Sequence, residues 1–368
     1  MKPVLVKNED KELQSILERN YDLLPGDQID PQTPCRWLLV KREMPVPDPY
    51  SGAERWSVDF FFLDQNAMPT FVECKRYLDT RARREVVGQV LEYAANGQRY
   101  WSGEDLRAYA DVTARQLYST TLEEVFSKLG SDISDSEEDF FKEAERRLKA
   151  GEVRIVFFLE QAPNELKSLV EFMNRQMETV EVLLVEARQY EEAGFRIVVP
   201  TLFGFTEQIR EIKRGKLTER KAVAFDWESF QGNALLKQLD EDTIGKIKKL
   251  YDKCRLLEAE MVWGRGIHTG SFSPKWTSIQ AKAAPFTVYA DGKLELHFSS
   301  LRNSESAKTF AELLASKIIQ GGLPLPEDHM ETYFTYGPTA WTSSVDALIS
   351  ALEVALSGCR LNSAAAQV

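Results

Sequence analysis

Two carboxylates and one ammonium group lie within apolar stretches in the N-terminal half of the chain. Asp59 precedes three consecutive phenylalanines, and Glu73 and Lys75 follow the apolar pair Phe71-Val72. Charged side chains among buried residues cost free energy unless a partner compensates them. A divalent cation would compensate the two carboxylates, and their hard oxygen atoms favour Mg²⁺ or Mn²⁺. These residue types therefore predict a metal site.

A β-hairpin is the element that would bring the three side chains together. Residues 57–64 and 70–76 are typical of strands, and the five residues between them suit a hairpin loop. The expected register places Asp59 opposite Lys75, with Glu73 as its diagonal neighbour. Because side chains alternate along a strand, all three would share one face.

The predicted site suits hydrolysis of a phosphodiester. Asp59, Glu73 and the backbone carbonyl of Cys74 would hold the metal ion, with positions left for water and a phosphate oxygen. Lys75 would orient the attacking water or stabilise charge that develops on the phosphoryl group. Two alternatives stay open: Glu73 and Lys75 as a salt-bridged pair on an edge strand, and Asp59 as the cap of a turn.

These motifs resemble those of a known family. Val58-Asp59 followed by Glu73-Cys74-Lys75 is similar to the signature of the PD-(D/E)XK nuclease superfamily. On the next predicted helix, Gln89 and Tyr93 match the QxxxY motif of its RecB-like members. The resemblance extends to uncharacterised bacterial proteins with this core, and it covers a little over half of the chain.

The resemblance implies further site residues. Gln89 and Tyr93 would join the catalytic residues by contacting the metal-site acids or the DNA backbone. Members of the family also use an acid on the first helix. The spacing to the apolar residues of that helix favours Asp10 as this metal ligand, with Glu9 and Glu12 as alternatives.

Four arginines follow the proposed metal ligands and suit contacts with nucleic-acid phosphates. They are Arg76, Arg81, Arg83 and Arg84. The alternative is a solvated surface that balances an acidic protein. The formal net charge of −11 excludes a protein that coats nucleic acid through bulk electrostatics, so any contact must be local.

Length and composition predict two domains. The 368 residues exceed what one hydrophobic core usually supports. We expect an α/β fold, with a restriction-endonuclease-like mixed sheet flanked by helices in residues 1–215. A smaller α+β accessory domain would follow in residues 221–368, after a charged linker at 211–221. Its role in recognition, dimerisation (giving a homodimer) or regulation is left open.

Several classes of protein are excluded by the same data. The four cysteines are widely separated and histidine occurs three times, which argues against a structural zinc site or a disulfide framework. No apolar run reaches the length of a membrane span, and no signal-peptide pattern opens the chain, so a cytoplasmic location is expected.

The sequence thus predicts a Mg²⁺- or Mn²⁺-dependent endo- or exonuclease whose partner is nucleic acid. DNA is the expected substrate, in defence or in DNA repair and processing, while RNA stays open. The competing interpretation is a catalytically inactive nuclease fold that binds nucleic acid or acts as a scaffold.

Overall fold

The computed structural model describes most of the chain. The described residues are 2–31, 33–47, 54–76, 82–129, 136–206, 208–210, 213, 226–264, 270–281, 283–302 and 304–365. They form two compact units, Met1–Ile29 with Cys35–Ala222 and Asp30–Pro34 with Val223–Val368. Apart from Lys213, the expected linker at 211–221 lies outside the described residues.

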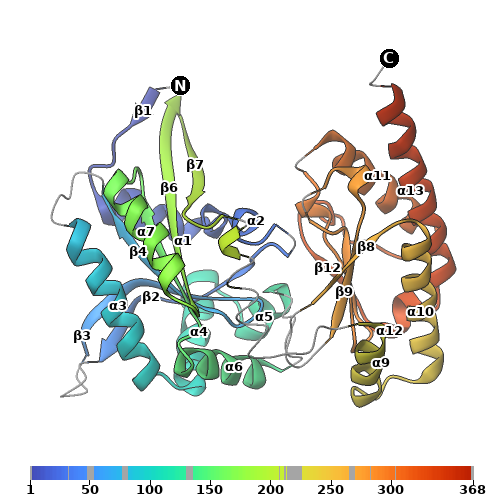
Figure 1. Cartoon of the computed structure of the whole chain (residues 1–368), viewed down its shortest axis with the longest axis horizontal. Helices are drawn as coiled ribbons and strands as arrows, with labels where there is room; N and C mark the ends of the chain where they lie inside the picture. Colours follow the sequence, from blue (N-terminus) through green and yellow to red (C-terminus); the bar gives the residue numbers. More distant parts are fainter. Residues whose placement is uncertain are drawn as a thin grey trace. The chain divides into compact units, whose positions relative to one another are not determined.

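The first unit is built on a seven-stranded sheet in the order β1-β6-β5-β4-β3-β2, with β7 paired to the other side of β6 (Figure 1). Strands β2 to β4 run antiparallel, whereas β4, β5 and β6 run parallel. The expected mixed sheet is therefore confirmed. The strands are β1 (Lys2–Val4), β2 (Trp37–Pro47), β3 (Glu54–Asp64), β4 (Pro69–Lys75), β5 (Val153–Leu159), β6 (Val180–Glu192) and β7 (Phe195–Phe203).

Helices cover both faces of this sheet, which explains why β4 and β5 are apolar on both sides. The helices on one face are α3 (Ala82–Tyr100), α4 (Gly103–Tyr118), α5 (Leu122–Leu129), α6 (Glu137–Lys149) and α7 (Asn164–Gln176). The opposite face carries η1 (Asp10–Gln14), α1 (Ser15–Arg19), η2 (Tyr21–Leu23) and α2 (Gly26–Ile29).

The hairpin of β3 and β4 forms, but the predicted register is wrong by two residues. Phe61 pairs with Phe71, and continuing this register places Asp59 level with Glu73 rather than with Lys75. A shift by an even number of residues keeps every side chain on its face. The three predicted site residues therefore still share one face of the sheet.

The turn explains the shifted register. The Asp64 carboxylate accepts the backbone N–H groups of Asn66 and Met68 at 2.9 and 3.0 Å. This side chain closes a tighter turn than the five-residue loop inferred from the sequence, because Asx side chains can replace backbone partners in turns. Strand β4 consequently begins at Pro69.

Helix α3 extends beyond its predicted end. A glycine directly after the helical pattern of residues 81–96 predicts a stop at Gly97, yet the helix continues to Tyr100. A Cβ atom at position 97 would lie 2.8 Å from the indole ring of Trp101. Glycine here allows close packing of Trp101, so its role is steric rather than helix-terminating.

The second unit is a five-stranded antiparallel sheet in the order β12-β11-β10-β9-β8. The strands are β8 (Glu260–Trp263), β9 (Ser271–Lys275), β10 (Phe286–Tyr289), β11 (Leu294–Leu296) and β12 (Phe334–Tyr336). The predicted hairpin at Asp291-Gly292 is confirmed, with Gly292 at φ +85°. The glycine-rich residues 265–269 between β8 and β9 lie outside the described residues.

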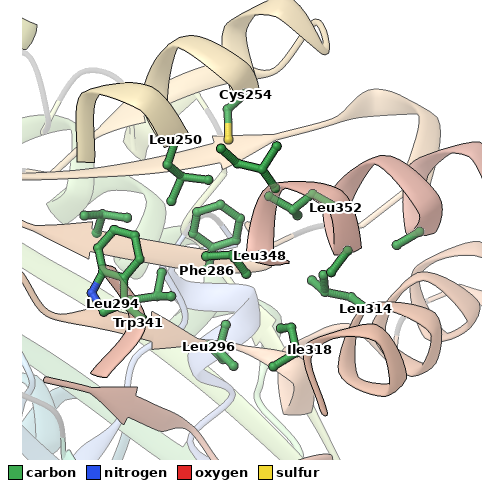
Figure 2. Packing of buried hydrophobic residues seen from close by; sticks show 14 of the residues in the cluster. Leu250, Cys254, Phe286, Leu294, Leu296, Leu314, Ile318, Trp341, Leu348 and Leu352 are labelled. Atoms are coloured by element: carbon green, nitrogen blue, oxygen red, sulfur yellow. The ribbon is translucent and has the colours of Figure 1, made fainter. Parts of the chain in front are cut away.

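Helices pack on the second sheet around a separate hydrophobic core (Figure 2). The helices are α9 (Trp227–Leu236), α10 (Glu241–Leu256), α11 (Glu305–Gln320), α12 (Pro338–Thr342) and α13 (Val345–Ala365). The sequence pattern over 233–258 predicts a single helix. This prediction is wrong: two helices form, because Asp240 caps the N-terminus of α10 by accepting the Thr243 N–H at 2.8 Å. None of the helices described in either unit is long and apolar enough to cross a membrane.

Candidate active site

Asp59, Glu73 and Lys75 lie where β3 and β4 separate. The β3–β4 pairs run from Leu63 and Pro69 to Phe60 and Val72. At the next level, the Asp59 carboxylate accepts the Cys74 N–H at 2.7 Å. The Asp59 side chain thus replaces a backbone partner of β4.

Lys75 joins two carboxylates at this end of β4. Its Nζ atom lies 2.8 Å from Glu73 Oε1 and 3.5 Å from Glu9 Oε1. The Glu73 side chain is only 2% exposed. Its second oxygen, Oε2, is buried and has no hydrogen-bond partner among the residues that the structure describes. Such an atom is costly unless a cation or a donor approaches it.

Burial and mutual repulsion disturb the ionisation of the two acids. Burial is the main cause that raises the pKa of Asp59 to about 7, and the nearby Glu73 carboxylate raises it further. Burial also raises the pKa of Glu73, although Lys75 opposes this shift. Burial alone would lower the pKa of Lys75, but the adjacent carboxylates, first Glu73, outweigh it and raise that pKa. Lys75 therefore stays protonated at neutral pH.

The acid that the first helix brings to this cluster is Glu9. Asp10 instead pairs with Arg42 of β2, and its side chain is 60% exposed. The expectation that Asp10 points along the buried face of the helix is therefore wrong, and the structure does not bring it to Asp59 and Glu73. Glu9 also accepts the backbone N–H of Arg76 at 3.2 Å.

A π-helical turn explains the exchange of Asp10 for Glu9. Residues Asp10–Gln14 form this turn, with Leu13 buried below it. In an α-helix the residues three and four positions before Leu13 both share its face, whereas a π turn, with more residues per turn, keeps only Glu9, four positions before, on that face. The α-helical period assumed from the sequence could not contain this irregularity.

Gln89 and Tyr93 of α3 form one unit beside the cluster. The Gln89 amide donates a hydrogen bond to the Tyr93 hydroxyl. Tyr93 is buried, and burial is the main cause of its raised pKa, with Glu73 a smaller contribution of the same sign. Glu73 and Asp59 thus influence the Tyr93 hydroxyl through space, while its contact with the metal-site acids remains a prediction.

The predicted arginines are only partly accounted for. Arg76 turns toward the N-terminal segment, where its Nη1 atom donates to Lys7 O at 2.7 Å. Arg81 lies outside the described residues, and Arg83 and Arg84 belong to α3 with side chains outside the description. Their expected phosphate contacts remain a prediction.

The donor set fits a hard divalent cation. Asp59 and Glu73 lie just beyond the last pair of β3 and β4, both are destabilised as anions by burial, and Glu73 Oε2 is a buried acceptor without a partner among the described residues. The Cys74 carbonyl faces the same side of β4 as its N–H group, toward Asp59. No group of three or more histidine, cysteine, aspartate or glutamate side chains in the described part of the chain is itself arranged as a metal site. Metal binding would thus draw on the backbone carbonyl and water as well.

Comparison with models of known protein families, with curated protein sequences and with solved structures gave no match to this chain. The function of the chain is therefore inferred from its residues and their geometry.

Proposed function

We propose that this chain is a metal-dependent nuclease of the PD-(D/E)XK type that hydrolyses phosphodiester bonds, with DNA as the expected substrate. The observation that supports this most is the buried Glu73 oxygen Oε2, which has no partner among the described residues and belongs to a carboxylate that contacts Lys75. Two acids that are both hard to ionise in a buried site are typical of a functional centre.

Asp59, Glu73 and the Cys74 carbonyl would hold Mg²⁺ or Mn²⁺. When bound, the ion would supply an activated water and charge neutralisation at phosphorus. Lys75, whose Nζ lies 2.8 Å from Glu73 Oε1, would act as a cation toward the phosphoryl oxygens. Gln89 would orient the Tyr93 hydroxyl toward the acids.

The test is cleavage of labelled single- and double-stranded DNA and RNA with Mg²⁺, Mn²⁺ or Ca²⁺. Glu73→Gln and Lys75→Met should each lower kcat by about 10²–10³-fold, since each removes a ligand or a fixed charge at the reacting phosphate. Lys142→Met, which changes an exposed lysine of α6, is the matched control and should leave cleavage unchanged.

The nucleic acid that is cleaved identifies the substrate class. Cleavage retained by both site variants would overturn the assignment. Binding of nucleic acid without cleavage by any metal would instead identify the inactive, binding form of the fold.

A further inference from the structure

A second charged cluster lies on β6 and α7. Glu186 is its centre: Oε1 lies 2.8 Å from Lys167 Nζ and accepts the Ala162 N–H at 3.0 Å, while Oε2 lies 3.0 Å from Arg188 Nη2. We call Lys167, Glu186 and Arg188 the Glu186 cluster. Glu186 and Arg188 belong to β6, and Lys167 belongs to α7.

The sheet register aligns this cluster with the candidate active site. Lys75 of β4 pairs with Leu159 of β5, and Leu159 pairs with Glu186 of β6. Paired residues point to the same face, so Lys75 and Glu186 share both a level and a face of the sheet. Two strand spacings separate them, which corresponds to about 10 Å.

The Glu186 cluster has a buried anion and contains one more cation than anion. Glu186 is 1% exposed, and although burial would raise its pKa, Lys167, the Ala162 N–H and Arg188 outweigh burial and lower it. The carboxylate is thus ionised, and two cations around one anion leave one positive charge. Lys167 also lies 3.9 Å from the centre of the Phe203 ring.

One member of the cluster is open to solvent. The Arg188 side chain is 51% exposed, although its Nε and Nη2 atoms contact Glu186. A guanidinium that is fixed on one edge and open on the other suits a phosphate oxygen. In a chain with net charge −11, nucleic acid must be bound through such local cations.

We propose that Lys167 and Arg188, oriented by Glu186, bind a backbone phosphate of the nucleic acid that extends from the cleavage site. The proposal rests on the nuclease function proposed above. A stacked strand advances about 3.4 Å per nucleotide. The separation of about 10 Å between the strand positions of Lys75 and Glu186 therefore corresponds to about three nucleotides between the scissile bond and this phosphate.

The test measures affinity and cleavage for DNA oligonucleotides of increasing length in single-nucleotide steps. Wild-type protein should gain about tenfold in affinity at the length at which the strand reaches the cluster. Arg188→Gln should lose this gain, raise KM for long substrates without changing kcat, and reduce the salt dependence of binding by about one ion. Short substrates should be bound equally by both proteins.

Three further variants test whether the gain in affinity depends on the Glu186 cluster. Arg188→Lys should recover part of the gain, because it keeps the charge and loses the planar fork. Lys167→Gln should resemble Arg188→Gln. Arg115→Gln, at an exposed arginine of α4 that pairs with Asp111, is the matched control and should behave as wild type.

The outcomes separate this proposal from the one on which it rests. Wild-type protein that neither binds nor cleaves nucleic acid overturns both. If wild-type protein cleaves, an Arg188→Gln profile equal to wild type at every length overturns the subsite alone. An equal loss at every length, accompanied by a lower unfolding temperature, also overturns it, because the cluster would then serve only to fasten α7 to β6.

Discussion

Asp59 and Glu73 are carboxylates in a place where ionisation is unfavourable. In the folded chain, burial and their proximity raise both pKa values. The unfolded chain exposes the same groups to water, where they ionise at ordinary pH. Each acid therefore links the protonation of the site to the stability of the first unit.

The sign of this linkage gives a prediction for Asp59. Its folded pKa of about 7 exceeds the ordinary aspartate value of 3.8, so the folded state binds the proton more tightly. Metal-free protein should consequently lose stability as pH rises from about 4 to about 7, with an upper limit on the order of 4 kcal/mol. Asp59→Asn should reduce this loss, since the amide does not ionise and its oxygen can still accept the Cys74 N–H.

Thermal unfolding in EDTA at pH 5 and pH 8 measures the effect. The difference between the unfolding temperatures at pH 5 and pH 8 should be smaller for Asp59→Asn than for wild type. Added Mg²⁺ should raise the wild-type value at pH 8 far more than that of the variant, because a ligand of the native state stabilises it. If the unfolding temperatures of wild type and Asp59→Asn depend equally on pH, the pKa of Asp59 is not raised in the folded protein.

Prediction at the residue scale was uneven. The Asp240 cap of α10 is encoded within three residues, yet a single helix was expected across it. The shared face of Asp59, Glu73 and Lys75 was accessible, because strand alternation alone places them together. The Glu186 cluster was not predicted, since its members are joined by strand pairing and by α7 packing. A glutamate within the apolar stretch of β6 was its only local signal.

At the scale of elements, the π turn of η1 decides which acid faces the site. Glu9 approaches Lys75 and the Arg76 backbone, whereas Asp10 pairs with Arg42. Glu9 and Asp10 are neighbouring acids with different partners, so mutating each in turn compares the two positions directly. If Glu9 supports the metal site, its loss should affect metal binding, and the loss of Asp10 should not.

We predict that Glu9→Gln weakens Mg²⁺ binding by about 10–100-fold and lowers cleavage accordingly, as expected for a group that orients site residues. Asp10→Asn should leave cleavage within about twofold and change stability by less than about 1 kcal/mol, because the Asp10 side chain is 60% exposed and Arg42 keeps Glu18 as a second partner. Isothermal calorimetry and cleavage kinetics measure both effects. A larger defect in Asp10→Asn than in Glu9→Gln would restore Asp10 as the helix acid.

Elements were predictable where periodicity was regular. The apolar stretches at β5, β6 and β7 indicated strands close to the observed bounds. Predictions missed where one side chain overrides the pattern: Asp64 tightens the β3–β4 turn, and Asp240 divides a long helical pattern. Hairpin register depends on such turn chemistry, which a count of loop residues does not contain.

At the scale of the whole chain, separate hydrophobic clusters support the two units. The first unit has one cluster on each face of its sheet, and the second has its own. All residues of the candidate active site and of the Glu186 cluster belong to the first unit. The length of the chain suggested two domains, but it could not show that Asp30–Pro34 groups with the second unit.

Lys213 marks how far the first unit must extend. It is buried, and its ammonium donates to the carbonyls of Met177, at 2.9 Å, and of Val180. Met177 ends α7 and Val180 begins β6. Lys213 thus holds the connection that leads into the strand carrying Glu186.

We therefore predict that a fragment of residues 1–222 folds and retains cleavage, whereas residues 1–206 form a less stable protein. The shorter fragment loses Lys213 and also Arg210, which donates to Phe205 O at 3.1 Å. Hydrogen bonds from charged groups contribute about 1.5–3 kcal/mol, so the shorter fragment should lose at least about 2 kcal/mol of unfolding free energy. Urea unfolding followed by circular dichroism measures the difference, and Lys213→Met in the 1–222 fragment should reproduce part of it.

A 1–222 fragment that fails to fold would mean that the first unit depends on residues beyond 222 despite its separate cores. A 1–206 fragment as stable as 1–222 would show that the contacts of Lys213 and Arg210 add nothing, and the boundary of the first unit would then lie before residue 207.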